Sequence, residues 1–202
     1  MISIKNLYKS FGEKNLFADY SLEIQKGEFL VFSGESGCGK TTMLNMIGWI
    51  EPFDKGDIIV NGISLTNRKK RLDFFRYEVG FLFQNFALIE NKNVLENLNI
   101  IKKQCRTEMS VFEALERIGL ADKINEKVYT LSGGEQQRIA LARLMLKRSN
   151  VILADEPTGS LDKKNAEAVI GILKDLNENG KTIVLVTHDE KIKTMGTRLI
   201  EL

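Results

Sequence analysis

The octapeptide GESGCGKT at residues 34–41 is the most informative segment of this 202-residue chain. Its spacing, G-x-x-x-x-G-K-[ST], is typical of a loop that wraps around phosphate groups. Glycines are needed because successive backbone N–H groups must turn toward phosphate oxygens, at positive φ and with no Cβ in the way. A strand is predicted before the loop, at residues 28–32, and a helix after it, at residues 42–50. We therefore expect a nucleotide phosphate site, because a glycine-rich turn without function would not need both elements.

The lysine and the threonine that close this loop have distinct expected roles. Lys40 is expected to reach the β- and γ-phosphates, and Thr41 is expected to place its hydroxyl on Mg²⁺. The positive end of the helix dipole adds to the attraction for phosphate. The candidate nucleotide-binding residues of the segment are Gly34, Glu35, Ser36, Gly37, Cys38, Gly39, Lys40, Thr41 and Thr42.

A second acidic element follows an apolar strand much later in the chain. The segment VILADE at residues 151–156 ends in two adjacent carboxylates. Asp155 is expected to bind Mg²⁺, through water, and Glu156 to accept a proton from the attacking water as a general base. A strand that simply ends in solvated acids is the plainer alternative, and the phosphate loop argues against it.

Hydrophobic periodicity indicates an α/β fold. Strands are predicted at residues 28–32, 57–60, 79–83, 151–154 and 182–187. Two of them are nearly continuous apolar runs, as expected for parallel strands that are covered on both faces. Residues 163–176 carry apolar side chains at helical spacing and are followed by Asn179-Gly180. The chain therefore contains a strand, helix, strand unit with a parallel sheet.

Two other regions depart from this parallel pattern. The first 33 residues and residues 57–65 are predicted to form antiparallel strands, with turns at Lys26-Gly27 and Asn61-Gly62. Residues 85–148 favour helix, which indicates a helical insertion. One apolar stripe in this insertion is formed by Val111, Phe112, Leu115 and Ile118. The charged run at residues 67–71 is interpreted as a solvated helix start in preference to a binding patch.

Composition and charge exclude several classes of protein. Apolar residues at 43% and charged residues at 28% are usual for folded soluble proteins, which argues against disorder or a disulfide scaffold. The 29 basic and 27 acidic residues leave a net charge of +2, so no nucleic-acid partner is expected from bulk charge. The sequence has neither a long apolar span nor a secretory signal. Its two cysteines, Cys38 and Cys105, are not spaced as metal ligands or as part of a disulfide framework. We expect a cytoplasmic chain.

The segment LSGGEQQR at residues 131–138 resembles the signature of ATP-binding cassette (ABC) ATPases, and it precedes the acidic strand as it does in that family. The resemblance covers residues 2–202. It implies an ABC ATPase fold: a P-loop NTPase core with a mostly parallel sheet, an N-terminal antiparallel β subdomain and an inserted α-helical subdomain. We expect one ATP-binding domain, residues 1–202, with the helical subdomain at about residues 85–149 and no regulatory domain.

The resemblance also implies that two copies pack head to tail on two ATP molecules. The residues that would bind the ATP held by the other copy are Ser132, Gly133, Gly134 and Glu135. Asp162, in the segment Ser160-Leu161-Asp162, resembles the family residue at the dimer interface. Gln84 resembles the glutamine that contacts Mg²⁺ and the attacking water, so it is a candidate both for catalysis and for the metal site, with Thr41 and Asp155.

Two aromatic positions complete the resemblance. His188, the single histidine of the chain, matches the residue that hydrogen-bonds the γ-phosphate, and it is assigned to catalysis with Glu156 and Gln84. Phe11 lies where the family stacks an aromatic ring, usually tyrosine, on adenine. Phenylalanine keeps the π-face and loses the hydroxyl, so we expect stacking to persist.

The chain is similar to cassettes of the lipoprotein-release, macrolide-export and bacteriocin-export group. This similarity implies a separate integral membrane permease that docks near Gln84, with an apolar patch at residues 86–89 as a candidate contact. It also implies export of peptide, lipoprotein or hydrophobic cargo, and a peripheral location on the inner face of the cell membrane. A soluble, non-transport ABC ATPase is the main alternative. A module that binds ATP without hydrolysis would not need Glu156 and His188, and a small kinase or GTPase would leave residues 131–138 without a role.

Overall fold

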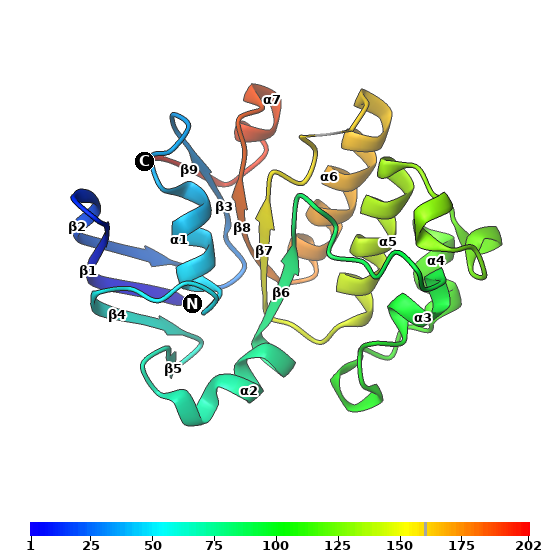
Figure 1. Cartoon of the computed structure of the whole chain (residues 1–202), viewed down its shortest axis with the longest axis horizontal. Coiled ribbons are helices and arrows are strands. Elements are labelled where there is room, and N and C mark those ends of the chain that lie inside the picture. The colour runs from blue at the N-terminus through cyan, green and yellow to red at the C-terminus, as the bar shows by residue number, and fades with distance from the viewer. Residues whose placement is uncertain (160) are drawn as a thin grey trace.

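A computed structural model describes residues 1–159 and 161–202, with Lys191 described by its backbone alone. Two β-sheets lie on either side of helix α1 (Lys40–Ile47), and the remaining long helices cover the far side of the second sheet (Figure 1). The predicted α/β fold class is confirmed. The predicted start of α1 at residue 42 is two residues late, because the helix begins directly at Lys40.

The first sheet is antiparallel and has the strand order β2-β1-β4-β5. Its strands are β1 (Ile2–Phe11), β2 (Lys14–Ile24), β4 (Lys55–Val60) and β5 (Ile63–Ser64). Asn61 and Gly62 both have positive φ, 47° and 80°, which is the geometry of a tight two-residue hairpin turn between β4 and β5. The sheet turns its apolar side chains, among them Ile2 and Ile4, toward α1.

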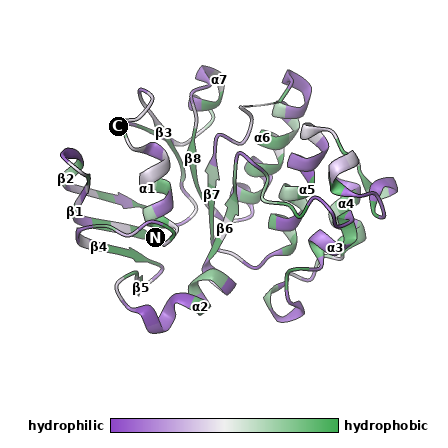
Figure 2. Ribbon diagram, in the orientation of Figure 1, coloured by the Kyte–Doolittle hydropathy of each residue, from purple (hydrophilic) through white to green (hydrophobic). Residues whose placement is uncertain are grey.

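The second sheet is parallel and has the order β6-β7-β8-β3-β9. Its strands are β3 (Phe29–Ser33), β6 (Val79–Leu82), β7 (Val151–Asp155), β8 (Thr182–Val186) and β9 (Arg198–Glu201). All five residues of β3 and of β8 are buried, as expected for strands that are covered on both faces. Figure 2 shows this sheet as the main apolar centre of the molecule.

The assignment of the first 33 residues to antiparallel strands is wrong for β3. This strand pairs in parallel with β8 and β9, and the turn at Lys26-Gly27 carries the chain from one sheet to the other instead of closing a hairpin. Local sequence could not separate these outcomes, because the partners of β3 lie more than 150 residues away in the chain. Strand β9 was not predicted, since its residues are mostly exposed and show no strong pattern.

Helices α5 (Gly133–Leu146) and α6 (Lys163–Glu178) cover the face of the parallel sheet opposite α1. The amphipathic pattern of α6 is confirmed, with Val169, Ile170 and Leu173 buried. On its other side α5 packs against α3 (Val94–Leu98) and α4 (Val111–Arg117), which form a separate apolar core with it. Shorter helical segments are η1 (Arg68–Lys70), α2 (Arg71–Asp73), η2 (Phe74–Glu78), η3 (Lys103–Cys105), η4 (Ala121–Lys123), η5 (Val128–Thr130) and α7 (Glu190–Lys193).

The apolar stripe predicted on α4 is wrong at Phe112. Leu115 and Ile118 are buried, whereas Phe112 is 54% exposed: the buried face is centred on Ala114, Leu115 and Ile118, and Phe112 falls at its edge. The interpretation of residues 67–71 as a solvated helix start is confirmed: the Asn67 side chain caps η1, and the run is exposed. The two cysteines are unpaired.

Lys147, at the end of α5, should make the stability of the folded state depend on pH. Its Nζ donates to the carbonyl of Val79 at 2.6 Å, and burial lowers its pKa to about 8. Nearby Cys105 and Glu78 favour the charged form, whereas Lys181 opposes it. The unfolded chain then binds more protons than the folded chain between about pH 8 and 10.5, so the folded state gains stability as the pH rises through this range.

We expect this gain to be less than about 1.4 kcal/mol per pH unit from Lys147. Urea unfolding at about pH 7.5, below this range, and at about pH 9.5, within it, measures the gain in stability of the wild type and of Lys147→Met. The variant should gain less stability than the wild type between the two values. Lys174→Met, at an exposed position of α6, is the control. An equal gain in all three chains would contradict the prediction.

Candidate functional site

The phosphate loop connects the end of β3 to the start of α1. Gly34 and Gly39 have φ angles of 138° and 108°, which side-chain-bearing residues rarely adopt. A Cβ on Gly34 would lie 2.5 Å from the carbonyl oxygen of Leu202, so space as well as conformation requires glycine there. Helix α1 has no side-chain cap and no acidic residue in its first turn. Its free N–H groups therefore form a site that favours an anion.

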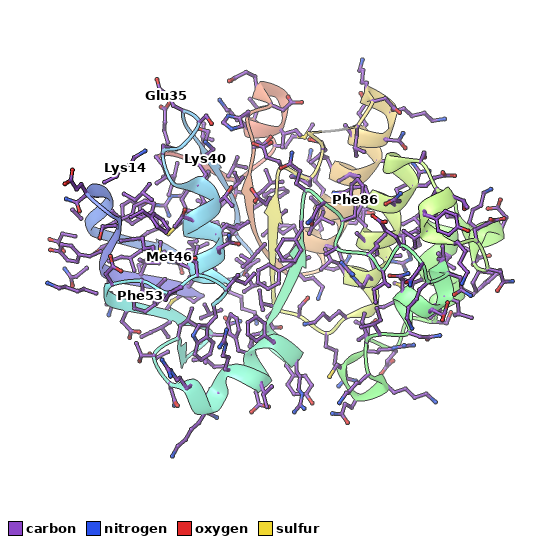
Figure 3. All side chains as sticks on the ribbon, in the orientation of Figure 1. Lys14, Glu35, Lys40, Met46, Phe53 and Phe86 are labelled. Carbon is purple, nitrogen blue, oxygen red and sulfur yellow. The ribbon has the colours of Figure 1, made fainter. Side chains whose placement is uncertain are left out.

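Lys40 lies at the start of α1 (Figure 3), and its side chain turns back into this loop. Its Nζ donates to the carbonyl oxygens of Gly34 at 3.0 Å and Glu35 at 2.7 Å, and it also lies 3.6 Å from the sulfur of Cys38. The side chain is buried. The ammonium group is thus held at the centre of the loop, where it can exchange carbonyl oxygens for phosphate oxygens.

Thr41 and Asp155 bring the two sequence segments together. The Thr41 hydroxyl donates to Asp155 Oδ1 at 3.1 Å. Burial raises the pKa of Asp155, while the Thr41 hydrogen bond and the charge of Lys40 lower it. A hydroxyl and a single carboxylate are suitable ligands for Mg²⁺, which typically takes few protein ligands and fills its remaining positions with water and substrate phosphate.

Glu156 is held in an unusual conformation directly after β7. Its φ is +44°, and its Oε1 is buried without a hydrogen-bond partner. The Nε2 of His188 lies 3.4 Å from Oε1, and the backbone N–H of His188 donates to Oε2 at 3.4 Å. A residue in such strain, with a buried acceptor that is free to take a proton, is typical of an active site.

These groups surround one cavity of about 700 Å³. Its lining residues are Phe11, Lys14, Leu16, Ser36, Gly37, Gly39, Lys40, Thr41, Thr42, Gln84, Asp155, Glu156, Gly159, Val186 and His188. The structure therefore brings together most of the selected residues, from five separate segments of the chain. Gly34, Glu35 and Cys38 belong to the loop but do not line the cavity. Lys14, which donates to the carbonyl of Gly37 at 3.1 Å, was missed because no motif includes it.

Phe11 stands at one end of the cavity and is 50% exposed. The ammonium group of Lys9 lies 4.4 Å from the centre of its ring. Lys9 itself is buried, and it donates to Glu51 Oε1 at 2.6 Å and to the carbonyl of Pro52 at 2.9 Å. The ring is thus supported by a fixed cation, a contact between residues of β1 that spacing alone did not reveal.

The segment at residues 131–138 does not line the cavity of its own chain. Ser132 caps α5, where its hydroxyl accepts from the N–H of Glu135 at 3.3 Å. The Glu135 carboxylate in turn accepts from the Ser132 N–H and hydroxyl, both at 2.8 Å, and the first of these bonds holds the pKa of Glu135 below its usual range. Gly133 and Gly134 form the first turn of α5. The cluster therefore lies apart from Lys40 within one chain.

Comparison with known proteins identifies the family. The family model described as ABC transporter matches residues 17–159, which is more than half of the chain. The chain belongs to the ABC transporter family. As an ABC ATPase it binds ATP, with Mg²⁺, and hydrolyses it.

Three similar proteins cover nearly all of this ABC ATPase. The macrolide export ATP-binding/permease protein MacB of Campylobacter jejuni is 39% identical over 100% of the chain, which spans only 33% of MacB. The phosphonates import ATP-binding protein PhnC of Lactobacillus johnsonii is 39% identical over 99% of the chain and 85% of its own length. A solved dimer of an ATP-binding cassette, in a post-hydrolysis state with ADP and Pi, has a TM-score of 0.87 at 36% identity, and covers 100% of this chain and 94% of its own.

In the ABC ATPase, Gln137 and Arg138 make a set of hydrogen bonds that the sequence did not predict. Gln137 is buried in α5, and its Nε2 donates to the carbonyl of Pro157, the residue after Glu156, at 2.8 Å. Arg138 donates to the side chain of Asn165, whose Nδ2 donates to Asp162 Oδ2 at 2.6 Å. The start of α5 is thereby connected to the loop that follows β7.

Asp162, the predicted dimer-interface residue of the ABC ATPase, caps α6. It accepts from the N–H of Asn165 at 2.9 Å, and this bond, more than any other, holds its pKa below the usual range. Its side chain is exposed, as a residue that meets a partner must be. Ser160, which belongs to the same predicted segment, lies outside the described residues.

The close approach of α5 and α6 predicts a large cost for Gly134→Ala in this ABC ATPase. A Cβ on Gly134 would lie 2.7 Å from Cγ and Nδ2 of Asn165. Asn165 cannot move away without losing its bonds to Asp162 and Arg138. We expect a loss of about 1–3 kcal/mol in the free energy of unfolding, measured by urea denaturation.

Gly133→Ala is the matched control for this prediction. A Cβ on Gly133 would meet nothing nearer than the Phe86 ring at 3.8 Å, an ordinary contact distance. Its free energy of unfolding should lie within about 0.5 kcal/mol of the wild-type value. If Gly134→Ala were no less stable than this control, the steric argument would be wrong.

Proposed function

We propose that the chain is the ATP-hydrolysing subunit of a membrane exporter and that it forms one ATP-binding domain, residues 1–202, with a helical subdomain at about residues 85–149. The observation that carries the proposal is the single cavity that joins Lys40, Thr41 and Asp155 to Glu156 and His188, while Ser132 lies outside it. Half of each ATP site is thus present in one chain, and the other half has to come from a second copy.

Within the cavity, Lys40 and the N–H groups of the glycine-rich loop bind the phosphates, and Phe11 stacks on adenine. Thr41 and Asp155, with Gln84 beside them, would hold Mg²⁺, which when bound neutralises negative charge on the phosphate oxygens. Their spacing supports this assignment, because Thr41 and Asp155 already lie within hydrogen-bond distance.

Hydrolysis then depends on the position of one water molecule. Glu156 accepts a proton from this water as its oxygen attacks the γ-phosphorus, and the bond to the ADP oxygen breaks. His188 and Gln84 position the water and the γ-phosphate. The short approach of His188 to Glu156, 3.4 Å between Nε2 and Oε1, supports their joint action.

A second copy completes each site in this proposal. Ser132, Gly133, Gly134 and Glu135 of one copy approach the γ-phosphate held by the other, and Asp162 lies at the interface. The dimeric cassette with ADP and Pi supports such an arrangement. The capping box of Ser132 and Glu135 supports it as well, because it keeps the glycine backbone of α5 in one conformation before the partner arrives.

The permease is the second partner in the proposal, and it places the chain at the inner face of the cell membrane. No helix in the described part of the chain is long and apolar enough to cross a membrane. The segment at residues 86–89 is a candidate contact, because Ile89 is exposed while Phe86 and Leu88 are only partly buried. MacB, whose name joins an ATP-binding part to a permease part and describes macrolide export, supports the direction of transport. The cargo proposed for this chain is peptide, lipoprotein or hydrophobic.

Co-purification tests this proposal. The chain is expressed with the permease genes that neighbour its own, extracted in mild detergent and assayed for ATP hydrolysis, with Glu156→Gln as the inactive control. We expect one permease to be captured and its ATPase activity to require Glu156. Strong Glu156-dependent hydrolysis without a membrane partner would favour a non-transport ABC ATPase, and capture of a permease that imports solutes, as the name of PhnC describes for that protein, would reverse the proposed direction.

A further inference from the structure

The segment that follows Gln84 has a strained backbone. Phe86 and Ala87 are consecutive residues with φ angles of 61° and 48°. Residues other than glycine rarely adopt this conformation, and such residues keep it only where surrounding contacts hold them in place. Gln84 lines the ATP cavity only two residues before this strained pair. The contacts that hold the pair therefore also determine where Gln84 lies.

Arg143 supplies those contacts from helix α5. One guanidinium nitrogen donates to the carbonyl oxygen of Ala87 at 2.5 Å, and another donates to that of Phe86 at 2.9 Å. Both residues of the strained pair are thus bound by one rigid, planar donor. Figure 3 places Phe86 between the parallel sheet and α5, so the loop bridges the catalytic core and the helical part of the chain.

The environment of Arg143 is unusual for a charged side chain. Burial lowers its pKa, and no salt bridge to it is found among residues 1–159 and 161–202. Arg143 is partly buried, and even a partly buried cation without a carboxylate partner is costly unless its N–H groups are hydrogen-bonded. Here the guanidinium group donates to backbone carbonyls of a strained segment, where an apolar side chain would leave those carbonyls without this donor.

We infer that Arg143 is a positioning residue that holds Gln84 in the ATP cavity by fixing the backbone at Phe86 and Ala87. The inference rests on the proposed role of Gln84 in hydrolysis. Through Arg143, α5, the helix that Ser132 caps, is linked to the catalytic position of Gln84, so that α5 and the Gln84 segment move together. A purely structural role, in which Arg143 only stabilises α5, predicts a loss of stability without a specific effect on the action of Gln84.

Steady-state ATP hydrolysis and ATP affinity of the full chain distinguish the two roles. For Arg143→Met we expect kcat to fall about tenfold or more while the Kd for ATP changes by less than about threefold, because Gln84 acts on the water and Lys40 on the phosphates. Gln84→Ala should give a similar fall in kcat. The double variant should lose little more kcat than either single variant, because each substitution already abolishes the action of a correctly placed Gln84 side chain.

Two other variants separate this effect from misfolding. Arg143→Lys keeps the charge and can reach one carbonyl, so it should retain part of the kcat and a thermal midpoint near that of the wild type. Ala87→Gly removes the conformational penalty at one of the strained residues, so Arg143→Met should cost less kcat in its presence than in its absence. Arg148→Met, at an exposed position just beyond α5, is the control for loss of an arginine.

The outcomes are distinct. Losses in kcat that multiply when Arg143→Met and Gln84→Ala are combined would overturn the inference, as would an unchanged kcat in Arg143→Met beside a low kcat in Gln84→Ala. An unchanged kcat in Gln84→Ala would overturn it too, through the role of Gln84. Failure of the wild-type chain to hydrolyse ATP even in a captured permease complex, by contrast, would count against the proposed function itself.

Discussion

Glu156→Gln should slow ATP hydrolysis by a factor of about 10²–10⁴, the usual contribution of a general base. The carboxylate is ready for this role, since its Oε1 is buried without a hydrogen-bond partner and Glu156 lines the same cavity as Lys40. Glutamine preserves the size of the side chain but cannot accept the proton. ATP affinity should stay within a few fold of the wild type, because Glu156 lies outside the phosphate loop.

The same variant should accumulate a dimer with ATP. If two copies close on two ATP molecules and hydrolysis reopens them, a chain that binds but does not hydrolyse stays closed. Gel filtration with ATP and Mg²⁺, and with ADP as the comparison, measures this. Glu167→Gln, at an exposed position of α6, is the control and should remain monomeric and active. A monomeric Glu156→Gln chain with full turnover would show that the role given to Glu156 is wrong.

Lys40→Met should weaken ATP binding by about 10- to 100-fold, which corresponds to the loss of one charge-assisted hydrogen-bond group of about 1.5–3 kcal/mol. The ammonium group already lies among the loop carbonyls, so little rearrangement is needed before it meets phosphate. Methionine keeps most of the buried length of the side chain and removes only the donor and the charge.

Isothermal titration with ATP and Mg²⁺ checks this expectation. Because the substitution also leaves the Gly34 and Glu35 carbonyls without their donor, a thermal melt of the nucleotide-free chain is needed alongside. We expect a folded chain with a slightly lower midpoint. Lys69→Met removes a lysine from the exposed turn η1 and should bind ATP as the wild type does. ATP affinity equal to that of the wild type in Lys40→Met would place the phosphates elsewhere.

Short spacing along the chain was enough to predict those parts of the protein that depend on neighbouring residues. Residues 34–41 had to form a phosphate loop because the glycines, the lysine and the flanking strand and helix lie together in the chain. The acids at 155 and 156 were placed by the apolar strand before them. Each of these features is set by backbone conformation within about ten residues, so neighbouring residue types were enough to find it.

Which distant segments meet could not be predicted from neighbouring residues and follows from the folded structure. It paired β3 with β8 and β9, turned Phe112 to solvent and placed Lys9 beneath the ring of Phe11. It also connected Gln137 to Pro157 and Arg143 to the strained pair after Gln84. These contacts depend on how sheets and helices pack, and a side chain that donates to a distant backbone carbonyl leaves no periodic pattern in the sequence, since every residue carries such a carbonyl.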